Sequence, residues 1–122
     1  MSRSIISEEE ECFLCSALYY AGQELPKDRG GKLEKHHIMF GYSSKDRQYS
    51  EKYGLWVRLC PYHHRNAKES VHKDKKVNVL MRKIAQKAFM REHPEDGFEK
   101  WMQLFRKNYL DDEGGENGEN VL

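Results

Sequence analysis

Three cysteines and one histidine lie in an order that is typical of a structural zinc site. Cys12 and Cys15 form a Cys-x-x-Cys step, and Cys60 and His63 form a Cys-x-x-His step farther along the chain. Thiolate sulfur and imidazole nitrogen are the donors that bind Zn²⁺ in closed tetrahedral sites. The long separation of the two steps is tolerable because the entropic cost of closing a loop grows only slowly with its length. The pattern predicts one structural zinc ion on these four side chains and leaves no cysteine as a nucleophile.

Two histidine pairs, His36-His37 and His63-His64, leave three more imidazoles outside that zinc site. Side chains in a strand alternate between its faces, so His36 and His37 should point in different directions. In a helix, His64 is rotated by about 100° from His63, which can turn it away from zinc and toward the strand. We therefore expect His36 and His64 to bind a catalytic divalent ion while a neighbouring imidazole activates water. These are the parts that phosphodiester hydrolysis requires.

The remaining histidines have different expectations. In an uninterrupted helix, His72 would lie about 12 Å along the axis from His64, too far to share an ion with it. It can join the site only if the helix breaks near residues 69–71. Glu34 shares the strand face of His36. We interpret His93, just before Pro94, as a surface or structurally satisfied side chain.

Short elements must position these side chains. Residues 12–15 are expected to form a compact turn, and strands are expected over residues 32–40 and 55–59. The polar stretch 41–54 is interpreted as a loop. Pro61 can occupy the first position of a helix that runs to about Glu69.

Two amphipathic helices follow. Asp74 is a suitable N-cap for the first helix, and the second is expected to open at Pro94. Their apolar faces carry Val77, Leu80, Met81, Ile84 and Ala88 in the first helix, and Phe98, Trp101, Met102 and Phe105 in the second. The expected fold class is therefore α+β, a strand–strand–helix unit with a zinc site followed by C-terminal helices.

The 122 residues suit one domain. Residues 1–11 are expected to be a flexible acidic lead and residues 111–122 a disordered acidic tail. The formal net charge is only +1 because acids gather at both ends, which leaves a basic body. Such a body suits nucleic-acid binding, but also an ordinary solvated surface. An odd cysteine count and the absence of an apolar run of roughly 18 residues favour a cytoplasmic protein without membrane association.

Three segments together resemble the zinc-stapled motif of HNH (ββα-metal) endonucleases. They are Glu34-Lys35-His36-His37-Ile38, Leu59-Cys60-Pro61-Tyr62-His63-His64 and the upstream Cys12-x-x-Cys15. The stretch from Tyr53-Gly54-Leu55-Trp56-Val57 through Val71-His72 to Phe105-x-x-Asn108-Tyr109 more closely resembles small HNH proteins of bacteriophages, recombination-enhancing nucleases among them. The similarity covers about residues 12–110. The resemblance implies a ββα-metal core in a nuclease domain over residues 12–110. It also implies metal-dependent nicking or cleavage of DNA, by a phage or prophage protein in the bacterial cytoplasm.

The resemblance also implies roles for individual residues. The second histidine of the strand pair, His37, corresponds to the general base. His36 and His64 correspond to ligands of the catalytic ion, which could be Mg²⁺, Mn²⁺ or Zn²⁺. Glu34 corresponds to a supporting residue, and His72 is the candidate for a further contact to the metal or the phosphate.

One position departs from the family pattern. Leu55 stands where many members carry an asparagine that orients the base. Either a nearby polar residue such as Ser50 or Glu51 takes that role, or the base is less well positioned.

Expected partners follow from the same reading. DNA is the first, and a recombinase or another DNA-processing protein of phage or host is the second. The substrate path could use the cations that flank the motif, Lys32, Lys35, Arg47, Arg58, Arg65 and Lys68. The alternative is a non-catalytic zinc module that binds DNA or a protein, in which the second histidine pair is incidental. A zinc deaminase fits poorly because its His-x-Glu and Pro-Cys-x-x-Cys pattern is missing.

Overall fold

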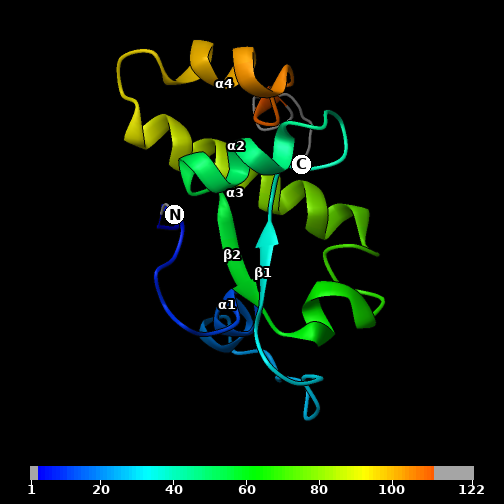
Figure 1. The fold of residues 1–122 in the computed structure, drawn as a ribbon. Coiled ribbons are helices and arrows are strands. Elements are labelled where there is room, and N and C mark those ends of the chain that lie inside the picture. The colour runs from blue at the N-terminus through cyan, green and yellow to red at the C-terminus, as the bar shows by residue number, and fades with distance from the viewer. Residues whose placement is uncertain (1–2, 112–122) are drawn as a thin grey trace.

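The chain folds as helices around a small two-stranded sheet, which confirms the mixed α+β class. The computed structural model describes residues 3–111. The elements are α1 (Phe13–Tyr20), β1 (Glu34–His37), α2 (Asp46–Tyr53), β2 (Trp56–Leu59), the π-helix η1 (Tyr62–Asn66), α3 (Lys75–Glu92) and α4 (Gly97–Phe105). The hairpin of β1 and β2 runs through the middle, with α1 at one end and α2, α3 and α4 toward the other (Figure 1).

The antiparallel hairpin separates two sets of side chains. His36 pairs with Val57 and His37 pairs with Trp56, so neighbouring histidines face opposite sides of the sheet. His36 is buried, whereas the side chain of His37 is 27% exposed. The first strand is shorter than the expected 32–40. Beyond it, only the bond from the Ile38 N–H to the Leu55 carbonyl, at 3.0 Å, continues the pairing.

Helix α2 corrects the expectation of a loop over residues 41–54. Its inward positions are Asp46, Tyr49, Ser50 and Tyr53, which recur at helical spacing but are mostly polar. Apolar periodicity therefore could not reveal the helix. Gly54 ends it in the left-handed region at φ 72°, where glycine is favoured.

The first residues of the chain also differ from expectation. The Cys12-x-x-Cys15 turn is the start of α1, with Cys12 as its N-cap accepting a hydrogen bond from the Cys15 N–H. Residues 3–11 contain no helix or strand, yet Ser4 is buried and donates to the Trp56 carbonyl. The Ile5 N–H donates to the Gly54 carbonyl at 2.9 Å. The flexible lead expected over residues 1–11 is therefore wrong for residues 4–6, which are anchored to the core.

Helices α3 and α4 supply much of the apolar core. Asp74 caps α3 as expected, because its side chain accepts from the Lys76 N–H at 2.9 Å. Helix α4 begins at Gly97 and not at Pro94, since residues 94–96 form a turn. A Cβ at Gly97 would lie 2.9 Å from the Cα of Met90, so the two helices meet closely there.

The expected apolar faces are only partly covered. Met81, Ala88, Trp101 and Phe105 are buried as expected. Leu80 and Phe98 are 51% and 46% exposed, because only part of each apolar face meets a neighbouring element. Of the expected tail over residues 111–122, Asp111 alone is described, and the rest lies outside the described residues.

We expect Gly54→Ala to destabilise the fold by more than about 1 kcal/mol, since it combines positive φ with a clash. A Cβ at Gly54 would clash with the Arg3 carbonyl oxygen. Urea unfolding measures the effect. The matched control is Gly22→Ala, which has φ 77° but no atom within 4 Å. Equal losses for the two variants would contradict the anchoring of residues 4–6.

Candidate functional site

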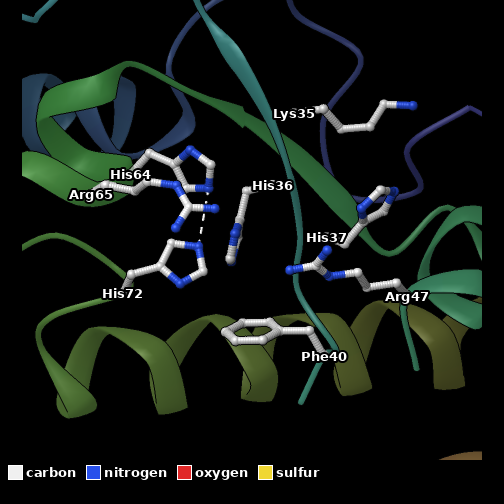
Figure 2. Close-up of a pocket in the computed structure, with 8 residues that line it drawn as sticks. All are labelled: Lys35, His36, His37, Phe40, Arg47, His64, Arg65 and His72. Atoms are coloured by element: carbon white, nitrogen blue, oxygen red, sulfur yellow. Dashed lines mark hydrogen bonds between the residues drawn. The ribbon is translucent and has the colours of Figure 1, made fainter. Parts of the chain in front are cut away.

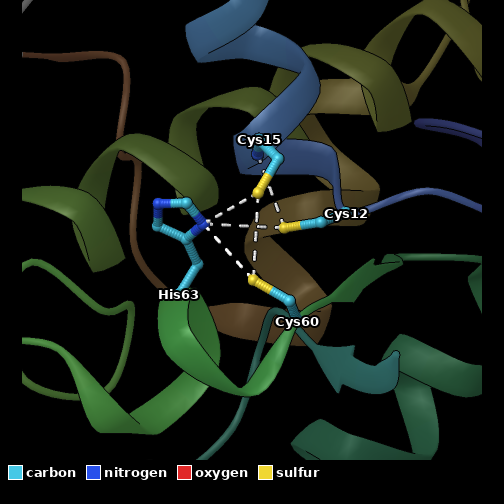
Figure 3. Close-up of side chains that lie close together, drawn as sticks. All are labelled: Cys12, Cys15, Cys60 and His63. Atoms are coloured by element: carbon cyan, nitrogen blue, oxygen red, sulfur yellow. Dashed lines mark hydrogen bonds between the residues drawn. The ribbon is translucent and has the colours of Figure 1, made fainter. Parts of the chain in front are cut away.

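Four side chains from three parts of the fold converge as the Cys/His frame, which consists of Cys12, Cys15, Cys60 and His63. Cys12 and Cys15 come from the start of α1, Cys60 follows β2, and His63 lies in η1 (Figure 3). All four are buried, and their donor atoms lie within 4.8 Å of one another. The sequence prediction of this set is confirmed as a group that can hold a metal such as zinc.

The distances within the frame match those around a tetrahedral zinc ion. The His63 Nδ1 atom lies 3.7, 3.4 and 3.5 Å from the sulfurs of Cys12, Cys15 and Cys60. The Sγ atoms of Cys15 and Cys60 are 3.9 Å apart. Usual zinc bond lengths at a tetrahedral angle place sulfur and nitrogen about 3.6 Å apart and two sulfurs about 3.8 Å apart. The side chains therefore need little movement to bind an ion.

The three thiols of the frame differ in their pKa values. Burial raises the pKa of Cys12, but the hydrogen bond to His63 and those from backbone N–H groups outweigh it, and the pKa is about 6. Burial and the nearby Cys12 charge raise the pKa of Cys15 to about 12. Burial likewise raises the pKa of Cys60. Three thiolates can coexist here only beside a cation, so metal binding must release protons.

A second group, the histidine cluster, consists of His36, His64 and His72. Their ring centroids are 5.1, 5.0 and 4.8 Å apart, and one nitrogen of each ring lies within 4.8 Å of the others. The Nε2 atoms of His64 and His72 face each other at 3.1 Å (Figure 2). These three imidazoles form the second group in residues 3–111 that can hold a metal ion.

The path of the backbone explains how His72 reaches the cluster. The helix expected to run to about Glu69 ends at Asn66, and the chain then turns back. The Val71 N–H donates to the His63 carbonyl at 2.8 Å, and the His72 N–H donates to the His64 carbonyl at 3.3 Å. The helix therefore breaks, as the participation of His72 requires, but a few residues before residues 69–71.

Burial lowers the pKa of two imidazoles in the histidine cluster, which favours the neutral form that can bind a cation. Burial, followed by the charge of His64, lowers the pKa of His36 to about 3, and its Nε2 is buried with no hydrogen-bond partner. Burial also lowers the pKa of His72 to about 4. His64 Nδ1–H donates to Glu34 Oε1 at 2.8 Å, and the other ring nitrogen, Nε2, faces His72 in the cluster. Glu34 thus contacts a member of the histidine cluster.

His37 lies beside the cluster but makes different contacts. Its Nε2 is 2.8 Å from Glu51 Oε1, on α2. Ser50, the other residue considered for orienting this histidine, instead exchanges hydrogen bonds with the backbone of Met39. Leu55 is fully buried in the core.

An open pocket of about 110 Å³ joins these parts. Figure 2 shows His37 and Arg47 on one side of it and His64, Arg65 and His72 on the other. The lining residues are Lys35, His36, His37, Phe40, Arg47, His64, Arg65 and His72. Phe40, which sequence reasoning missed, packs against His36 and His72 with centroids 5.7 and 5.0 Å away. No sequence signal marked it, because it is an ordinary apolar residue after a strand.

The expected nucleic-acid contacts divide into two sets. Lys35, Arg47 and Arg65 line the pocket. Arg58 lies over the Trp56 ring at 5.0 Å and Lys35 over the same ring at 4.2 Å. Arg58, Lys68 and Lys32 are not part of the lining of this pocket, and Lys68 and Lys32 are exposed.

Comparisons with protein-family models, with curated proteins and with solved structures gave no match to this chain. Within residues 3–111, no helix has the length and apolar character needed to cross a membrane.

We expect Cys60→Ala to lose the frame's metal ion and cooperative folding together, because binding at a structural zinc site is coupled to folding. Metal content and thermal unfolding of the purified protein measure both effects. His72→Ala is the control, since it belongs to the other group, and it should retain the frame's ion. A Cys60→Ala variant that melted like wild type would show that the frame is not a structural metal site.

Proposed function

We propose that this protein is a metal-dependent DNA endonuclease of the HNH (ββα-metal) type, phage or prophage encoded. The observation that carries the proposal is one basic pocket lined by three converging imidazoles and a fourth, His37, beside them. Strand β1 supplies His36 and His37, η1 supplies His64, and the turn after η1 supplies His72. The cytoplasmic location and a recombinase partner remain predictions.

The histidine cluster supports a divalent ion at the reaction centre. Three imidazole nitrogens suit Zn²⁺ or another transition metal better than Mg²⁺, which prefers oxygen ligands. Such an ion would stabilise the negative charge that develops on the phosphoryl and leaving oxygens. The orphaned Nε2 of His36 is the clearest reason to expect it, because buried polar atoms usually have a partner.

His37 is suited to be the general base. It is partly exposed, lines the pocket and is not part of the histidine cluster. A neutral imidazole accepts a proton from water near neutral pH, and general bases of this kind contribute typically 10²–10⁴-fold to a rate. The strand therefore provides a metal ligand and a base from adjacent residues.

The size and charge of the pocket favour a phosphodiester of a polymer over a small metabolite. Its volume of about 110 Å³ is well below the roughly 300–1,000 Å³ of ordinary ligand pockets. Lys35, Arg47 and Arg65 give it cations of the kind that contact phosphates. A phosphate can enter while the bases and sugars of the nucleic acid stay outside.

Nicking of supercoiled plasmid is the direct test. Wild type should convert it to open-circular or linear DNA with Zn²⁺, Mn²⁺ or Mg²⁺, and EDTA should stop the reaction. His37→Ala should retain the fold and lose at least about 100-fold in rate, since it removes the base. His93→Gln, a histidine outside the pocket, is the control and should cut like wild type. Absence of cleavage by wild type, with DNA binding intact, would favour the non-catalytic zinc module.

Metal stoichiometry separates the two functions independently of activity. With Zn²⁺, we expect two ions per chain in wild type, and one in His36→Ala, which removes a ligand of the histidine cluster only. Isothermal titration and elemental analysis measure the count. One ion in both proteins would contradict the catalytic metal centre and leave the Cys/His frame as the only occupied group.

A further inference from the structure

We propose that Glu51 is a positioning residue that holds His37 with its proton on Nε2, so that Nδ1 is the nitrogen that accepts a proton from water. The role of Nδ1 as the acceptor of a proton from water rests on the proposed function. The contact between Glu51 and His37 does not, because it follows from the structure around the imidazole.

Hydrogen bonds of the preceding residue, Ser50, set the position of Glu51. Ser50 is fully buried, donates to the Met39 carbonyl at 2.9 Å and accepts from the Met39 N–H at 3.0 Å. The Leu55 N–H donates to the Ser50 carbonyl at 2.8 Å. These bonds fix the end of α2 against the chain leaving β1, and the next residue, Glu51, then faces His37.

Lys35 also contacts the Glu51 carboxylate. Its Nζ lies 3.0 and 3.3 Å from the two oxygens of Glu51. The same ammonium group packs over the Trp56 ring at 4.2 Å, and Trp56 pairs with His37 in the hairpin. The carboxylate is therefore oriented by two groups of one strand face, Lys35 and His37.

The chemistry of the carboxylate fixes the histidine tautomer. Glu51 lies beside the Lys35 ammonium group, at 3.0 Å, and a carboxylic acid is ionised near neutral pH, so the group can only accept hydrogen bonds. His37 Nε2, 2.8 Å away, must then carry hydrogen. In the neutral ring the other nitrogen, Nδ1, has the lone pair.

This tautomer of His37 determines how protons and bonds change in the hydrolysis step. Nδ1 takes a proton from water as the water oxygen forms a bond to phosphorus, and the bond from phosphorus to the leaving oxygen breaks. The leaving alkoxide takes a proton from solvent. The imidazolium keeps its Nε2–H bond to Glu51, whose negative charge opposes the positive charge formed on the ring.

Nitrogen-15 NMR of the zinc-loaded full-length protein tests the tautomer without any activity, because Nδ1 and Nε2 of neutral histidine have different shifts. We expect His37 as the Nε2–H form in wild type. In Glu51→Ala the ring should lose this preference, with an Nδ1–H population appearing. Glu51→Gln has nearly the same shape and keeps an acceptor oxygen, so it should lie between the two. A predominant Nδ1–H form in wild type would overturn the proposal.

Plasmid nicking under single-turnover conditions tests the catalytic consequence. Glu51→Ala should lower the maximal rate by about 10- to 100-fold, less than the loss of the general base itself, with a smaller change in the DNA concentration at half-maximal rate. Glu51→Gln should recover part of the rate. The matched control is Glu69→Gln, which removes the charge of an exposed glutamate that accepts from the Tyr62 hydroxyl at 3.0 Å and does not line the pocket.

The outcomes separate this inference from the proposed function. Full activity in Glu51→Ala beside an active wild type would overturn the positioning role and leave the nuclease standing. A faster Glu51→Ala would also overturn it, because the carboxylate would then block the base. An inactive wild type with His37 in the Nε2–H form would contradict the nuclease and support the Glu51 contact.

Discussion

The meeting of the four side chains of the Cys/His frame is the constraint on which the rest of the structure depends. It joins the start of α1 to the end of β2, although residues 21–33, between α1 and β1, contain no helix or strand of their own. Because His63 is held in the frame, its neighbour His64 has little freedom and turns toward Glu34 and the histidine cluster. The first group of donors therefore sets the geometry of the second.

The alternation of a short strand then divides two kinds of chemistry. His36 faces the buried side, where desolvation holds its pKa near 3 and keeps it a neutral donor. His37, one residue later, faces the side where Glu51 and Lys35 lie. Two adjacent imidazoles thus have unlike surroundings, one suited to a cation and one to proton transfer. Adjacent residues of a strand point to opposite faces, whereas adjacent residues of a helix lie about 100° apart on its surface.

The cations around the pocket come from elements that are distant in sequence. Arg47 comes from α2, Arg65 from η1 and Lys35 from β1. Arg82 of α3 donates to the Phe40 carbonyl at 3.0 Å and to the Tyr109 hydroxyl at 3.0 Å. Phe40 in turn packs on His72. The C-terminal helices therefore support the wall of the pocket as well as the core.

The amino-acid sequence by itself determined the Cys/His frame and the pairing of His36 with His64, because cysteine and histidine have few other uses at such spacing. It also determined the opposite directions of His36 and His37, since strand alternation is local geometry. Tertiary structure alone decided the rest. Helix α2 was hidden because its inward positions are largely polar, and with it the contact of Glu51 to His37. The place of His72 depended on where η1 ends, and long-range backbone bonds to residues 63 and 64 decide that end.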